Sequence, residues 1–136
     1  MSTYKLFTDG AITKNPGGEA SYGFVLYKDN KKISFGYGII GSGAMMNNEL
    51  AECYAISQGL SEFLRHWDTP KSRLTIYNDN QYVLSQIYKN KNIRQQLKQL
   101  EKLIDVSVKW IPRSKNTEAD KLTKRLRTLN CLAYSE

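Results

Sequence analysis

The sequence predicts an α/β protein with one mixed sheet of five strands flanked by helices, in the order βββαβααβα. Segments that alternate apolar and polar residues predict the strands, and segments that repeat apolar residues every three to four positions predict the helices. The length of 136 residues adds the third observation, because it matches one ordinary domain. We therefore expect a single domain spanning residues 1–136.

Three strands open the chain, at residues 4–8, 21–27 and 33–40, where apolar, β-branched and aromatic side chains gather. The turn-forming run Asn-Pro-Gly-Gly at 15–18 separates the first two, and a polar run at 28–31 separates the last two. Such short polar connections predict an antiparallel meander.

A helix follows at about 48–65, where Asn47 and Asn48 offer capping side chains ahead of an apolar helical stripe. The segment 66–72 contains Pro70 and breaks the helix. An alternating run at 73–77 predicts the fourth strand.

Two helical patterns come next, at 81–87 and 93–104, followed by an alternating fifth strand at 106–110 that Pro112 ends. A last helix at about 117–129 places apolar residues on one stripe: Ala119, Leu122, Leu126 and Leu129. We expect Tyr54, Leu60 and Trp110 in the core, and Trp67 as a cover over a helix end.

The charge points to a polyanionic partner. Twenty Lys and Arg residues against thirteen Asp and Glu residues give +7, of which residues 1–63 carry −1 and residues 64–136 carry +8. Without the carboxylates of Asp9, Glu52, Asp79 and Asp120, the remainder carries +11. No apolar run approaches the ~18 residues of a membrane span, and no helix pairs a basic face with an apolar one, so nucleic acid is favoured over a membrane.

The two cysteines, Cys53 and Cys131, have neither disulfide-framework nor zinc-site spacing, and the first residues do not resemble a signal peptide. We expect a cytoplasmic protein.

Four carboxylates stand among small or amide residues: Asp9, Glu52, Asp79 and Asp120. If the first and fourth strands are adjacent and parallel, Asp9 and Asp79 lie at the carboxyl ends of neighbouring strands, where open α/β sheets bind ligands. Carboxylates gathered in one crevice would raise one another's pKa and oppose folding unless a cation joined them. Ligands that offer only oxygen suit Mg²⁺ or Mn²⁺ rather than zinc.

Five motifs around these residues occur in register over residues 6–126: Thr8-Asp9-Gly10-Ala11, Asn15-Pro16-Gly17, the Asn48 to Glu52 segment, Asn78-Asp79-Asn80-Gln81-Tyr82-Val83 and the Asn116 to Leu122 segment. In this order the chain resembles the type 1 ribonuclease H family and its fold. The resemblance implies an endonuclease that hydrolyses the RNA strand of RNA/DNA hybrids and leaves 5′-phosphate and 3′-hydroxyl ends.

The resemblance also implies a two-metal mechanism, in which Asp9, Glu52, Asp79 and Asp120 hold two Mg²⁺ or Mn²⁺ ions. By the same likeness, Asn15, Asn48 and Gln81 match positions that read RNA 2′-hydroxyls in the minor groove. We expect further substrate contacts from Arg113, Asn116, Lys89, Lys91 and Arg94, and a monomeric protein.

The chain departs from the family in three places. Glu49 adds an acid beside the site, for which we favour a solvated role at the helix start. The segment 112–116 is too short for the histidine-bearing loop of many members, and His66 does not match the position of that histidine. Product release or proton transfer would then have to rely on water, Arg113 or Lys115. The basic protrusion after the fourth strand is reduced, so hybrid affinity is expected to be modest.

Two alternatives remain open. A ribonuclease H-like module could hold nucleic acid without cutting it, although the intact carboxylates argue against this. A DNA-cutting relative, such as a transposase or integrase core, would share the fold but is disfavoured by Asn15, Asn48 and Gln81.

Overall fold

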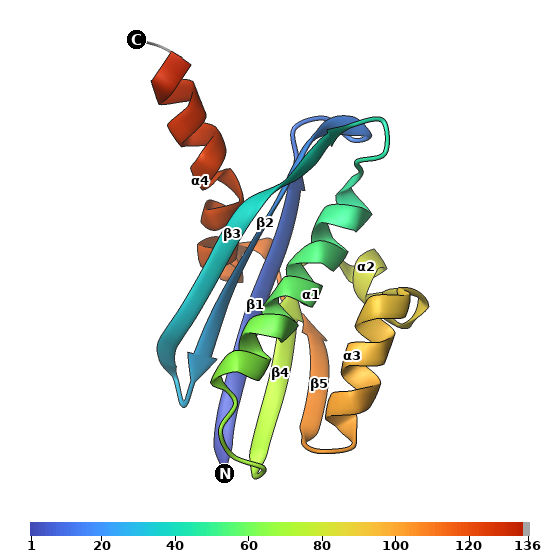
Figure 1. Ribbon diagram of the computed structural model, residues 1–136, viewed down its shortest axis with the longest axis vertical. Coiled ribbons are helices and arrows are strands. Elements are labelled where there is room, and N and C mark those ends of the chain that lie inside the picture. The colour runs from blue at the N-terminus through green and yellow to red at the C-terminus, as the bar shows by residue number, and fades with distance from the viewer. Residues whose placement is uncertain (135–136) are drawn as a thin grey trace.

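The computed structural model describes residues 1–134, with side chains through residue 126, and contains a five-stranded sheet in the order β3-β2-β1-β4-β5 (Figure 1). The strands are β1 (Ser2–Ile12), β2 (Gly17–Lys28), β3 (Lys31–Gly43), β4 (Ser72–Asn78) and β5 (Asp105–Trp110). The helices are α1 (Asn48–His66), α2 (Gln81–Ser85), α3 (Lys91–Glu101) and α4 (Thr117–Tyr134), with short 3₁₀ turns at Ile87–Lys89 and Arg113–Lys115. The predicted order of elements is confirmed.

Strand pairing also agrees with the prediction. The meander β1-β2-β3 is antiparallel, while β4 pairs in parallel with β1 on one side and with β5 on the other. The first strand is longer than predicted and includes Asp9, because its antiparallel pairing with β2 continues to Ile12 opposite Ala20. Its parallel pairing with β4 ends earlier, at Phe7 opposite Tyr77.

Asparagine side chains set the helix starts. Asn47 caps α1, since its Oδ1 accepts the Leu50 N–H at 2.8 Å, and Asn90 caps α3 by accepting from Ile93 N–H at 3.1 Å. The predicted bounds of the two helices at 81–87 and 93–104 are wrong: α2 ends at Ser85, and α3 begins at Lys91 and ends at Glu101.

In the described part of the chain, no helix has the length and hydropathy needed to cross a membrane.

The helices cover the sheet from both sides, with α1 and α3 on one face and α4 on the other (Figure 1). Beneath α1 the core is continuous from Tyr4 and Leu6 of β1 to Leu60 and Phe63 of the helix. The expectation for Leu60 is confirmed, and Trp67 covers the end of α1 by stacking on Phe63 at 6.1 Å.

Two residues expected in the core are not buried. Tyr54 is 38% exposed and Trp110 is 47% exposed. The buried stripe of α1 is made of other residues, and Trp110 ends β5, an edge strand. Sequence spacing places a residue on a face of its element, but neighbouring elements decide whether that face is covered at that point.

Helix α4 contacts β2 through small residues. Ser21 Oγ donates to the Thr123 carbonyl at 2.6 Å, and Ala119 of the predicted stripe is fully buried. A Cβ added at Gly23 would lie 2.6 Å from the Ala119 carbonyl oxygen, closer than van der Waals contact allows. Glycine is thus required where the helix backbone lies directly on the strand. Leu129, the last residue of the predicted stripe, lies outside the described side chains.

We expect Gly23→Ala to lower the free energy of unfolding by about 1 to 3 kcal/mol, because the added methyl group meets backbone that must move. Urea denaturation of the purified protein measures it. Gly41→Ala is the matched control, since its added Cβ would lie 3.5 Å from the nearest atom, Met46 Sδ. Equal stability of the two variants would contradict this account of the packing.

Candidate active site

Three carboxylates meet where the parallel strands separate. Asp9 and Asp79 each lie two residues beyond the last parallel pair of β1 and β4, and Glu52 enters from the first turns of α1. One ligand oxygen of each lies within 4.8 Å of the other two. Asp9 and Glu52 are only 2% exposed, and Asp79 is partly buried. The topology therefore places three acids from distant parts of the chain around one point.

Gly10 allows α1 to approach β1 closely enough to deliver Glu52. Its N–H donates to Glu52 Oε1, and a Cβ at this position would lie 2.3 Å from the backbone of Ala51 and Glu52. The glycine in the Asp-Gly pair is thus required by contact between strand and helix.

A buried amide joins the ends of the two parallel strands. Asn78 Nδ2 donates to the Thr8 carbonyl oxygen at 3.2 Å and to Thr8 Oγ1 at 3.1 Å. Its Oδ1 accepts from Asn80 N–H at 2.8 Å, which bends the chain directly after Asp79. Asn78 therefore holds both aspartate-bearing segments in place.

Asn116 performs a similar task from the start of α4. Its Nδ2 donates to the Thr8 carbonyl at 2.9 Å and to Asp79 Oδ2 at 3.1 Å, while Oδ1 is buried without a hydrogen-bond partner. The residue is 1% exposed. We therefore revise the expected substrate contact: burial keeps this amide from solvent, and it orients Asp79 instead.

The fourth predicted acid, Asp120, lies beside the group on α4. Its carboxyl shares a hydrogen bond with Asp9 and also pairs with Lys124 at 3.2 Å. It is not among the three acids that lie within 4.8 Å of one another. Asp120 thus borders the site and, unlike the other three, has a salt bridge among the described side chains.

The surroundings of Asp9 and Glu52 oppose their ionisation. Burial, then the charges of Glu52 and Asp79, raise the pKa of Asp9 to about 10. Burial likewise raises the pKa of Glu52 to about 7, despite the opposing hydrogen bond from Gly10. The salt bridges of the described side chains, residues 1–126, involve other carboxylates.

This donor set fits a hard divalent cation. It offers only oxygen atoms, and Mg²⁺ and Mn²⁺ prefer such ligands. A cation here would supply positive charge to three acids that form no salt bridge with any side chain of residues 1–126.

The acids form the floor of a hollow of about 400 Å³, lined by Asp9, Gly10, Asn48, Glu52, Asp79, Asn80, Gln81, Trp110 and Arg113. It brings three predicted substrate-binding residues to the carboxylates: Asn48, Gln81 and Arg113. Asn15 lies next to them without lining the hollow, since its Oδ1 accepts the Asn48 N–H at 3.1 Å.

The remaining predicted contacts are not among the residues that line the hollow. Lys89 ends a 3₁₀ turn, and Lys91 and Arg94 belong to α3. Glu49 is exposed in the first turn of α1, outside the three-acid group, and its role at the helix start stays a prediction.

Sequence reasoning missed Trp110 as a residue of the hollow. The alternation along 106–110 predicts the same core position for Trp110 as for Val106 and Val108. One feature of the sequence sets Trp110 apart, its place at the end of the strand, two residues before Pro112.

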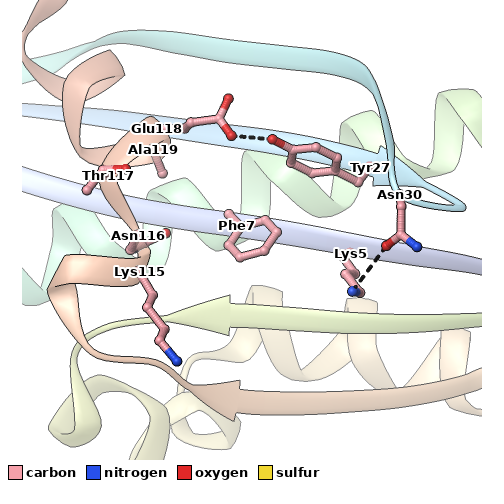
Figure 2. A pocket seen from close by; sticks show the side chains of 9 residues that line it. All are labelled: Lys5, Phe7, Tyr27, Asn30, Lys115, Asn116, Thr117, Glu118 and Ala119. Atoms are coloured by element: carbon pink, nitrogen blue, oxygen red, sulfur yellow. Dashed lines mark hydrogen bonds between the residues drawn. The ribbon is translucent and has the colours of Figure 1, made fainter.

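A second hollow, of about 220 Å³, lies on the sheet face where α4 begins (Figure 2). Figure 2 shows Phe7 at its floor, the Tyr27 hydroxyl donating to Glu118, and Lys5 donating to Asn30 at 3.3 Å. Glu118 also pairs with Lys32 at 2.8 Å. Its carboxylate is therefore paired with a lysine, whereas no salt bridge of the described side chains involves the three acids of the first hollow.

Comparison with known proteins gives a family match over most of the chain. The sequence model of the family described as reverse transcriptase-like matches residues 7–126.

Solved structures with the same fold include three ribonucleases H. The chain is similar to ribonuclease H1 from the halophilic archaeon Halobacterium salinarum, with 23% identity and a TM-score of 0.71, covering 93% of this chain and 98% of that one. It is also similar to the N-terminal ribonuclease H domain of a Mycobacterium tuberculosis protein, with 20% identity and a TM-score of 0.74, covering 98% of this chain and 99% of that one. A third match is a compost ribonuclease H1 crystallised in complex with an RNA/DNA hybrid, with 18% identity and a TM-score of 0.67, covering 90% of this chain and 94% of that one.

The metal-free protein should lose stability as the pH rises. The pKa values of Asp9 and Glu52 are raised in the folded state, so over pH 5.5 to 8.5 the folded protein binds more protons than the unfolded chain. The free energy of unfolding then falls with pH, and Glu52 contributes up to about pH 7. Urea denaturation with a chelator measures this, and Mn²⁺ should reduce the fall.

Asp68 and Glu118 do not contribute to this pH dependence, because their pKa values are lowered and both carboxylates stay ionised from pH 5.5 to 8.5. Stability that is constant or rises with pH without metal would contradict the raised pKa values of Asp9 and Glu52.

Asp9→Asn should stabilise the metal-free protein by at least about 1 kcal/mol at pH 8, because a neutral amide replaces the acid with the most unfavourable environment. The same change should weaken Mn²⁺ binding, measured by calorimetric titration. Asp105→Asn serves as the control, since Asp105 pairs with Arg73 at 3.1 Å on the exposed surface. A less stable Asp9→Asn protein would contradict the prediction.

Proposed function

The chain belongs to the reverse transcriptase-like family and has the ribonuclease H fold, and from this premise we propose that it is a ribonuclease H. The proposed activity is endonucleolytic hydrolysis of the RNA strand of RNA/DNA hybrids, leaving 5′-phosphate and 3′-hydroxyl ends. The observation that carries the proposal is the group of Asp9, Glu52 and Asp79, which lies at the strand ends and forms no salt bridge with the side chains that the structure describes.

The acids are proposed to hold two Mg²⁺ or Mn²⁺ ions, with Asp120 as the fourth ligand. Bound there, the ions would supply charge neutralisation for the phosphodiester and an activated water. The chain's own residues do the rest: Gly10 keeps α1 against β1, and Asn78 and Asn116 hold Asp9 and Asp79 in register. Such preorganisation spares the site from reorganising during the reaction.

Amide groups support RNA as the strand that is cut. Asn48 and Gln81 border the acids, and an amide can both donate to and accept from a 2′-hydroxyl. Asn15 orders this edge through its hydrogen bond to Asn48. We propose that these residues read the sugar, as their match to the family implies. The compost ribonuclease H1 bound to a hybrid supports the choice of substrate class.

Basic residues are proposed to provide affinity. Arg113 lines the hollow beside the acids, and Lys89, Lys91 and Arg94 lie beyond it on the basic second half of the chain. Contacts of lysine and arginine with phosphates release counterions, so hybrid affinity should fall steeply with salt.

The second candidate is a ribonuclease H-like module that binds nucleic acid without cutting it. The absence of room for the family's histidine-bearing loop at 112–116 favours it, whereas the three assembled carboxylates favour catalysis. Calorimetric titration with Mn²⁺ in the presence of hybrid separates the two, because a non-catalytic module has no need to bind the ion.

We expect wild-type protein with Mg²⁺ or Mn²⁺ to cut a labelled RNA/DNA hybrid, and to leave duplex RNA and duplex DNA intact. Asp79→Asn should reduce the rate at least about 100-fold while the protein stays folded, since it removes one anionic ligand. Glu49→Gln is the matched control and should retain activity, because Glu49 lies outside the three-acid group. Gel analysis of the products gives both the rate and the end chemistry.

Undiminished cutting by Asp79→Asn would remove the proposed metal site. Equal cutting of all three duplexes would remove the proposed reading of 2′-hydroxyls.

A further inference from the structure

The hollow above the carboxylates contains one large apolar surface, the indole of Trp110. Among the described residues that line it, every other side chain is charged or an amide, apart from Gly10. Trp110 is nevertheless 47% exposed. Leaving a ring of this size in water forgoes the favourable free energy of burying it, so its place beside the acids calls for an explanation.

Backbone pairing places the indole next to the metal-binding group. Trp110 is opposite Asn78 in the parallel β4-β5 pair, and Ile111 N–H donates to the Asn78 carbonyl at 3.1 Å. The indole Nε1–H donates to the carbonyl oxygen of Asp79 at 3.1 Å. The ring is therefore held at one end by the residue whose carboxylate belongs to the three-acid group.

This hydrogen bond decides what the indole can offer a ligand. The ring has one polar group, Nε1–H, and that group is already used within the protein. The exposed remainder is apolar and has a fixed orientation. It suits a nonpolar surface of a ligand whose charged part lies at the acids and at Arg113.

A nucleotide within a duplex has such a surface on its sugar. The faces of paired bases are stacked inside the duplex, which leaves the C–H groups of the sugar as the apolar surface next to each phosphate. We infer that Trp110 contacts the substrate by packing its indole against the sugar of a nucleotide adjacent to the phosphate held at the carboxylates. The inference rests on the proposed function and names one further specificity residue for it.

Kinetics test the contact. Trp110→Ala should raise KM for a short hybrid about tenfold and change kcat less, because the indole binds a part of the substrate that does not react. Trp110→Phe should restore most of the loss, since it keeps an apolar ring. Phe35→Ala, a change at an aromatic that is 50% exposed on β3 and outside the hollow, should leave KM unchanged.

A second readout uses fluorescence, because the chain has two tryptophans. Trp67 stacks on Phe63 at the end of α1, away from the hollow. Titration with hybrid in Ca²⁺, an oxygen-binding cation with looser geometry than Mg²⁺, should change the emission of wild-type protein and of Trp67→Phe. Trp110→Phe, which keeps Trp67, should show no change.

The outcomes separate the inference from the proposed function. Anisotropy of a labelled hybrid, recorded in the same titration, reports binding independently of tryptophan. If the hybrid binds while the Trp110 emission and the KM of Trp110→Ala stay unchanged, the inference is wrong and the proposed function stands. A lower melting temperature of Trp110→Ala with unchanged KM also overturns it, because that result describes a structural residue. A hybrid that is neither bound nor cut by any of these proteins overturns both.

Discussion

Repulsion among buried carboxylates is the constraint on which the rest of this structure depends. Asp9, Glu52 and Asp79 come together within 4.8 Å, and burial, followed by the charges of Glu52 and Asp79, raises the pKa of Asp9 to about 10. Replacing one of these acids with a neutral residue would make the metal-free protein more stable. The surrounding scaffold must therefore supply enough favourable packing to hold three acids where they would not gather on their own.

Among the described residues, the scaffold does this with backbone contact and amide groups rather than with salt bridges to cationic side chains. Gly10 lets α1 lie against β1, while Asn78 and Asn116 fasten Thr8 and Asp79 through buried hydrogen bonds. A lysine or arginine paired with these acids would relieve the repulsion, but it would also compete with a metal ion. The amides orient the same groups and leave their charge available to a bound ion.

The hollow combines chemically different walls from distant parts of the chain. Its floor is acidic, Asn48 and Gln81 contribute amides, Arg113 contributes a cation, and Trp110 contributes the apolar surface. A nucleotide has a phosphate, a sugar hydroxyl and an apolar sugar surface, and the proposed contacts give each of these groups a chemically matching wall. The basic second half of the chain, at +8, extends the attraction beyond this hollow.

By itself the sequence determined the order of strands and helices, because hydrophobic periodicity and turn residues act locally, and it identified the acids through motifs in register. Tertiary structure decided what depends on neighbours distant in the chain. Trp110 has the same alternation as Val106 and Val108, and only the position of β5 at the edge of the sheet exposes it. Asn116 has a polar side chain suited to substrate, yet α4 buries it against β1 and Asp79. Burial is a property of the elements that cover a residue, and the local pattern does not contain them.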